Sequence, residues 1–177
     1  MLTRRSVLKS GAASAAALAL TTPAFAADPT PSEKLNKLFD TFIDENLDLS
    51  PTFATSLGVD KGPRAKQKYE LDESSLASIK KGQDLQASQL QRLEAFDRAS
   101  VPASDQLTYD IVDFNLKNQV ADNAKYQYAG GGAGAPYIIS QKNGQYSNIP
   151  SFLDNQHTIE TKEDADAYLA RLEQFGA

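Results

Sequence analysis

The 177-residue sequence contains no cysteine and a single histidine, His157. Without cysteine the fold cannot form disulfides, so core burial alone must hold it together. One imidazole cannot build a histidine-based zinc site, and there is no cysteine nucleophile for it to activate. No Gly-x-Ser-x-Gly motif is present either, so a serine nucleophile of that type is not expected. We therefore predict a structural or surface role for His157.

The sequence also lacks an apolar run long enough to cross a bilayer, which takes about 20 residues. Its most apolar stretch, residues 11–20, is shorter and rich in alanine. Arg4 and Arg5 precede this stretch, and Ala24 and Ala26 follow it as the small residues that signal peptidase requires. We interpret residues 1–26 as a cleaved twin-arginine signal peptide and expect no stable membrane anchor.

This signal implies two partners, the twin-arginine translocase and signal peptidase, and a periplasmic or secreted location. The remaining chain, residues 27–177, has one domain's length. Cleavage removes three basic residues and no acid, so the formal charge changes from −5 to −8. An acidic surface repels phosphate backbones, and no nucleic-acid partner is expected.

Helical patterns dominate the mature chain, and the sequence predicts an all-α fold. Residues 30–33, Thr-Pro-Ser-Glu, have the order of a capping box, so a helix is expected from there to about Leu47. Residues 50–58 combine serine, proline and a final glycine in the order of a short helix. Further helices are expected after Asp72 as a cap, near Ser104, at Pro150 and after Thr161, with an exposed loop at residues 59–69.

The helix after Ser104 is the best core candidate in the sequence. Leu107, Ile111 and Phe114 recur at helical spacing, and Val112, Leu116 and Val120 widen the apolar face. We expect the Phe114 ring to be buried.

Residues 126–150 break the helical pattern with glycines and turn residues. A phosphate-binding loop is not supported there, because the lysine and hydroxyl residue of such loops are missing. We interpret the segment as an irregular loop with a short strand at residues 137–140. Its candidate cleft-lining residues are Gly131, Gly132, Gly134 and Tyr137.

Two acidic patterns could suggest chemistry. Residues 44–48 resemble the start of a calcium loop, but Leu49 stands where that loop needs glycine, so we interpret them as the solvated end of a helix. Asp110 and Asp113 lie three residues apart on a predicted helix. Such a pair can perform acid and base work when buried, but carboxylates at this spacing more often face water or cap a neighbouring helix.

Three segments in order carry a resemblance to a known family: residues 50–58 (SPTFATSLG), 105–111 (DQLTYDI) and 164–172 (DADAYLARL). The chain resembles the N-terminal part of the bacterial "domain of unknown function 885" family. The resemblance implies a largely helical protein of several hundred residues, similar to zinc metallopeptidases. It also implies zinc in the full-length parent, a peptide substrate, and a 27–177 segment that is a truncated part of a larger helical fold.

The family's chemistry lies on a later helix with a His-Glu pair and a further histidine, a pattern absent from this sequence. No catalytic, cofactor-binding or metal residue is therefore predicted here. Two hypotheses remain: the front portion of an exported peptidase or related hydrolase, inactive alone, or a complete small periplasmic binding or interaction protein.

The signal assignment predicts export of the folded chain by the twin-arginine route. Changing Arg4 and Arg5 together to lysine should leave the precursor in the cytoplasm, as cell fractionation and immunoblotting would show. N-terminal sequencing of the exported wild type should begin at Ala27. Unchanged export of the double variant, or cleavage elsewhere, would refute the assignment.

Overall fold

The computed structural model describes residues 28–126, 139, 141 and 144–175, and these are helical with no strand among them. This confirms the predicted all-α class. The helices are α1 (Pro31–Leu49), α2 (Pro51–Ser56), the 3-10 helix η1 (Gly62–Tyr69), α3 (Leu76–Glu94), the 3-10 helix η2 (Arg98–Ser100), α4 (Ala103–Lys125), α5 (Gln145–Asn155) and α6 (Lys162–Phe175). Of the strand predicted at residues 137–140, only Ile139 is described.

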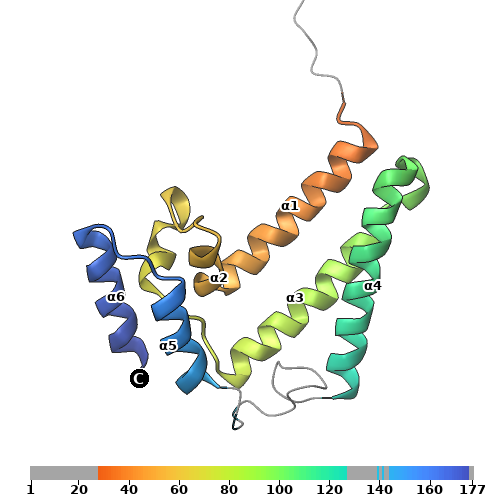
Figure 1. The fold of residues 1–177 in the computed structure, drawn as a ribbon. Helices are drawn as coiled ribbons and strands as arrows, with labels where there is room; N and C mark the ends of the chain where they lie inside the picture. Colours follow the sequence, from red (N-terminus) through yellow and green to blue (C-terminus); the bar gives the residue numbers. More distant parts are fainter. Residues whose placement is uncertain (1–27, 127–138, 140, 142–143, 176–177) are drawn as a thin grey trace, which may run out of the picture.

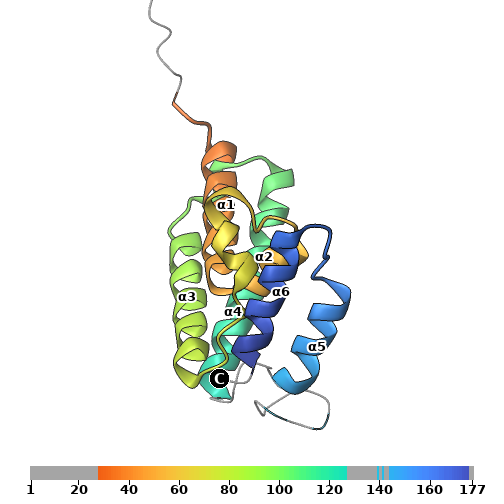
Figure 2. The ribbon, with the colours of Figure 1, turned by 90° about the vertical axis from the view of Figure 1, so that its left-hand side faces the viewer.

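The helices form two groups (Figure 1). The long helices α1, α3 and α4 make one group, in which α3 packs along α4. The short elements α2 and η1 make the other group together with α5 and α6, and α6 contacts η1 (Figure 2). In the described part of the chain, no helix has both the length and the apolar character needed to cross a bilayer.

The predicted start of α1 is confirmed. The Thr30 hydroxyl accepts a hydrogen bond from the Glu33 backbone N–H at 3.2 Å, and the Glu33 carboxylate accepts one from the Thr30 N–H at 2.7 Å. This reciprocal capping box satisfies N–H groups that the first helical turn leaves without partners. The short helix α2 is confirmed as well, and Gly58 after it has a φ of 68°, the left-handed conformation that favours glycine.

The predicted cap of the third helix was wrong. Asp72 instead serves α2: its carboxylate accepts hydrogen bonds from the Thr52 N–H at 2.9 Å and the Ser50 hydroxyl at 2.7 Å. The helix begins at Leu76, and the Ser75 hydroxyl caps it by accepting from Ser78 N–H at 3.1 Å. A carboxylate near a helix start can cap any N-terminus that folding brings within reach, so local sequence alone did not identify its partner.

Residues 59–69 were also interpreted incorrectly, because they are not a fully exposed loop. Most of them form η1, and both Asp60 and Gln67 are buried. The Gln67 amide donates to the Leu47 carbonyl at 2.7 Å. Arg64 forms ion pairs with Asp44, at 3.0 Å, and with Asp48. The acidic end of α1 therefore binds an arginine.

Two polar side chains of α3 join it to α1. Arg92 makes two hydrogen bonds to the Glu45 carboxylate, at 2.7 and 2.6 Å, and its guanidinium lies 4.9 Å from the centre of the Phe42 ring. The Arg92 hydrogen bonds lower the pKa of Glu45. The buried Gln89 amide adds contacts to Glu45 and to the Phe42 carbonyl, at 3.2 and 3.4 Å. Bidentate pairing of this kind fixes geometry as well as charge.

The predicted core face of α4 was wrong for its central residues, although Leu116 is buried in the core and Val112 packs against it as predicted. Leu107, Ile111 and Phe114 are 63, 53 and 67% exposed, whereas Tyr109 and Leu116 are buried. The Tyr109 hydroxyl donates to the Leu93 carbonyl at 3.0 Å, so the helix presents that side to α3. The core is formed by Leu35, Phe42, Leu93, Val101, Tyr109 and Leu116.

This core predicts a contrast between two substitutions. Leu93→Ala removes a side chain with no exposed surface and should lower the free energy of unfolding by about 2 to 5 kcal/mol. Phe114→Ala truncates a larger but exposed ring and should cost less than about 1 kcal/mol. Urea titration of both variants measures the difference. A larger loss for Phe114→Ala would mean that α4 is rotated about its axis.

Candidate functional site

Arg171 of α6 has no exposed surface and connects four segments of the chain. Its guanidinium also lies 5.0 Å from the centre of the Phe152 ring of α5. Burial lowers the pKa of Arg171 from its ordinary value. Among the described residues no carboxylate pairs with it directly, and it donates hydrogen bonds to the Glu70 carbonyl at 2.9 Å, the Gln67 carbonyl at 3.0 Å, the Thr55 hydroxyl at 2.6 Å and His157 Nδ1 at 2.6 Å.

The contacts of His157 fix its protonation state. Arginine can only donate a hydrogen bond, so His157 Nδ1 must accept from Arg171. A carbonyl can only accept, so Nε2 must carry the proton that it shares with the Asp164 carbonyl at 2.9 Å. The imidazole is therefore neutral and buried, and its edge meets the Tyr168 ring. Of the predicted structural or surface role of His157, the surface alternative is wrong, because the side chain is buried, and its two hydrogen bonds agree with the structural alternative.

Asp164 organises the segment that leads into α6. One of its carboxylate oxygens accepts from the Thr161 N–H and hydroxyl, both at 2.8 Å, and from the Glu160 N–H at 3.1 Å. The other oxygen forms an ion pair with Lys68 of η1. The Lys68 hydrogen bond, followed by the bonds from Thr161, holds the pKa of Asp164 well below its usual range. The predicted cap is confirmed too, because Thr161 Oγ1 accepts from the Asp164 N–H at 3.2 Å.

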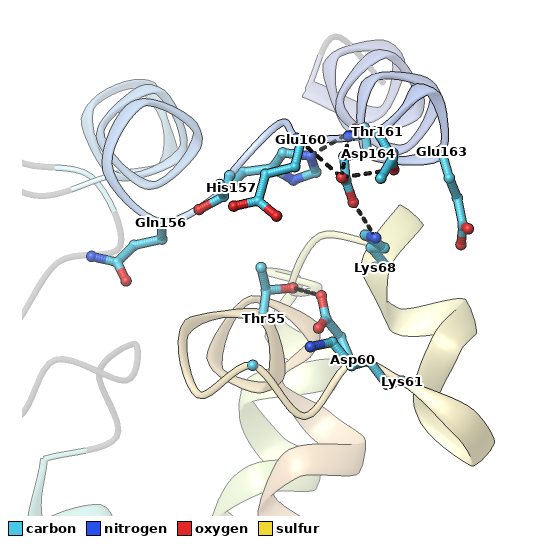
Figure 3. Close-up of a pocket in the computed structure, with 12 residues that line it drawn as sticks. Thr55, Asp60, Lys61, Lys68, Gln156, His157, Glu160, Thr161, Glu163 and Asp164 are labelled. Atoms are coloured by element: carbon cyan, nitrogen blue, oxygen red, sulfur yellow. Dashed lines mark hydrogen bonds and ion pairs between the residues drawn. The ribbon is translucent and has the colours of Figure 1, made fainter.

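A polar cavity of about 410 Å³ lies between the region of α2 and η1 and the segment that leads into α6. One wall comes from α2 and the turn after it, and the other comes from the segment before α6 (Figure 3). The lining residues that matter below are Thr55, Asp60, Lys61, Lys68, Glu160 and Asp164.

Asp60 is the most unusual group in this cavity, because it is only 6% exposed and forms no ion pair within the described residues. One of its oxygens accepts from the Thr55 hydroxyl at 2.9 Å. The Thr55 oxygen in turn accepts from Arg171, so this hydroxyl bridges the two groups. Burial lowers the pKa of Arg171, and the nearby charge of Asp60 partly offsets that effect. Asp60 also interacts with Lys68. The hydrogen bond from Asp164 is the main cause of the raised pKa of Lys68, and the negative charge of Asp60 adds to it.

The structure does not bring the other sequence candidates into the cavity. Asp110 pairs with Arg98 at 2.6 Å and Asp113 with Lys117 at 2.8 Å, so both carboxylates of α4 are held in ion pairs. The Arg98 hydrogen bond lowers the pKa of Asp110. The signal residues Arg4, Arg5, Ala24 and Ala26 and the cleft candidates Gly131, Gly132, Gly134 and Tyr137 lie outside the described residues and stay predictions.

Sequence reasoning missed Arg171 and Asp60. The buried face of α6 consists of Asp164, Ala167 and Arg171, spaced three and four residues apart. Two of these residues are charged, so a search for apolar periodicity assigns this face to solvent. The sequence pattern that could have identified this buried face is an alanine that lies at helical spacing between two charged residues.

The family resemblance implies a zinc ion, and a zinc site needs several ligating side chains close together. Among residues 28–126, 139, 141 and 144–175, no group of three or more histidine, cysteine, aspartate or glutamate side chains is placed to hold a metal ion. Catalytic zinc usually takes three protein ligands. These residues therefore do not fit such a site, and no reaction step through zinc can be derived from them.

The all-α fold and the buried arginine network define a structural class, but they do not define an activity. Its family is defined by comparison: residues 51–177 match the model of a bacterial protein of unknown function, DUF885. The match covers most of the chain, which therefore belongs to this family. Neither a curated protein nor a solved structure matches the chain.

The depressed pKa of Asp164 predicts acid sensitivity. A carboxylate whose pKa is lower in the folded state stabilises the fold above its unfolded pKa of about 3.9, and this stabilisation is lost as the pH falls below that value. In urea titrations, Asp164→Asn should be less stable than wild type at pH 7 and should lose less stability between about pH 5 and pH 2.

The matched control is Asp166→Asn, which removes an exposed ion pair with Lys162 on the same helix. Exposed pairs of this type contribute little, so its pH profile should follow wild type. Parallel profiles for wild type and Asp164→Asn would contradict the assigned role of Asp164.

Proposed function

We propose that this chain is the N-terminal helical scaffold of an exported, zinc-dependent peptidase or related hydrolase. In this proposal the zinc ligands and the reacting groups belong to further residues of a longer polypeptide. Family membership and the resemblance to zinc metallopeptidases support the proposal. The described residues contribute shape to a peptide-binding cleft, and they do not contribute catalytic groups.

The observation that carries the proposal is the exposed apolar stripe of α4. Leu107, Ile111 and Phe114 follow one another at helical spacing, and each is more than half exposed. On α6, Leu169, Leu172 and Phe175 are also exposed. Apolar patches on two helices of one small chain are typical of surfaces that another part of a protein covers.

The polar network around Arg171 suits a scaffold. It joins α6 to η1 and α2 through directional hydrogen bonds, and Phe152 brings α5 into the same unit. The hydrogen bonds fix the position of α6 relative to η1, and the ring contact adds α5. The segment between α4 and α5 contains the predicted cleft residues, so the network would hold one end of that segment in place.

The test compares the 177-residue chain with the longest natural gene product. Phe114→Ser should reduce self-association of the 177-residue chain in light scattering and change its free energy of unfolding by less than about 1 kcal/mol. In the longer product the same substitution should cost about 3 kcal/mol or more, because the ring becomes buried. Elemental analysis should find zinc in the longer product, together with peptidase activity.

Leu76→Ser is the control, because Leu76 is 70% exposed and lies on another helix, at the start of α3. It should be neutral in both proteins. A reading frame that stops after codon 177 would contradict the proposal and favour a complete binding or interaction protein. A longer product without zinc or peptidase activity would contradict the enzymatic part alone.

A further inference from the structure

We propose that the cavity between α2 and the segment before α6 binds an organic ammonium group, held between the carboxylates of Asp60 and Glu160. This inference does not depend on the proposed peptidase function, because it rests on the cavity's own side chains. The evidence is the incomplete pairing of a buried carboxylate, the position of a second carboxylate on the opposite wall, and the charge of the lining.

Asp60 is the first element of the site. A buried carboxylate is costly unless it is paired and hydrogen-bonded. Only one oxygen of Asp60 has a hydrogen-bond partner in the described structure, the Thr55 hydroxyl, and that hydroxyl is shared with Arg171. The second oxygen has acceptor capacity left, and Asp60 lines a cavity that a ligand can enter. A donor in the cavity would complete its hydrogen bonding, and a positive charge on that donor would add to the attraction that Arg171 and Lys68 already exert without direct contact.

Glu160 is the second element. Its backbone N–H donates to the Asp164 carboxylate at 3.1 Å, which holds this residue on the wall opposite Asp60. Its own carboxylate forms no hydrogen bond or ion pair within the described residues. Figure 3 shows Glu160 on the side of the cavity with His157 and Asp164, whereas Asp60 and Thr55 lie on the other side. A cation in the cavity would therefore have an acceptor on each wall.

The lining charges favour a cation over an anion. Lys68 is neutralised by its ion pair with Asp164. Three lining carboxylates, Asp60, Glu160 and Glu163, then outnumber the one remaining lysine, Lys61. A cavity lined mainly by one sign of charge concentrates ligands of the opposite sign.

The donors that the cavity needs define the chemical class. A primary ammonium carries three N–H donors on a compact charge, enough to reach acceptors on two walls. A volume of about 410 Å³ is within the range of small-molecule sites. The amino terminus of a peptide and an aliphatic diamine share this chemistry, and both serve as probes below.

The first experiment titrates the 177-residue chain with putrescine, glycinamide, tetramethylammonium and acetate, followed by amide chemical shifts in NMR. Putrescine or glycinamide should shift the resonances of residues 55–61 and 156–164. The probe that binds more tightly identifies the source, a diamine or a peptide amino terminus. Tetramethylammonium has the charge but no N–H donor and should bind at least about tenfold more weakly.

Variants then test the two carboxylates. Asp60→Asn and Glu160→Gln should each weaken binding of the better probe by about tenfold, because each replaces a charged acceptor by a neutral one. Asp84→Asn, which removes an exposed ion pair with Lys80 on α3, is the matched control and should leave binding unchanged. Lys61→Met should tighten binding, because it removes the unpaired positive charge from the lining.

Lys61 is exposed, so Lys61→Met should not disturb the fold. This variant therefore tests the proposal even if Asp60→Asn unfolds the chain. Weaker or unchanged binding in Lys61→Met would overturn the proposal. So would equal affinity for tetramethylammonium, binding of acetate in place of the amines, or no shifts with either amine. Tighter binding of Ca²⁺ than of both amines at these residues would also overturn it.

Discussion

The buried guanidinium of Arg171 is the contact on which the C-terminal half of the described structure depends. A charged group without exposed surface loses its hydration, and in the described part of the chain no carboxylate touches it to compensate. Two carbonyls, a hydroxyl and an imidazole nitrogen accept its protons, and an aromatic ring lies against it. Because these acceptors come from three segments, α2, η1 with its C-cap and the turn that contains His157, the arginine can be satisfied only when all three are in place.

This dependence explains why the candidate site lies where it does. The hydrogen bond from Arg171 orients the Thr55 hydroxyl, and that hydroxyl positions one oxygen of Asp60. The bond to His157 fixes the other wall, because the imidazole also binds the Asp164 carbonyl. One side chain, Arg171, thus fixes the two walls of the cavity relative to each other. Burying a charge in this way contributes little net stability, because the lost hydration offsets the hydrogen bonds gained.

The sequence predicted those features that depend on local chemistry. The capping box at Thr30, the short helix ending at Gly58 and the helix start at Thr161 each need only residues a few positions apart, and all are present. The buried side of α4 could not be predicted in the same way. Apolar residues occur around much of that helix, and only the contact with α3 selects Tyr109 and Leu116 over Phe114.

The site was less predictable than the fold for a related reason. Asp60 and Arg171 are charged, and they are buried because folding brings together groups more than 100 residues apart in the sequence. Long-range contacts of this kind leave no local periodicity. The family match over residues 51–177 includes Thr55, Asp60, His157 and Arg171 but excludes α1 entirely.

The two helix groups therefore differ in what holds them together. The group of α1, α3 and α4 encloses the apolar core around Leu93, whereas α6 meets η1 mainly through Arg171, Asp164 and their polar partners. Apolar contacts tolerate small shifts, but hydrogen bonds lose strength steeply with distance and angle. The polar contacts of the second group thus fix the two walls of the cavity relative to each other, as the Arg92 pair fixes α3 relative to α1.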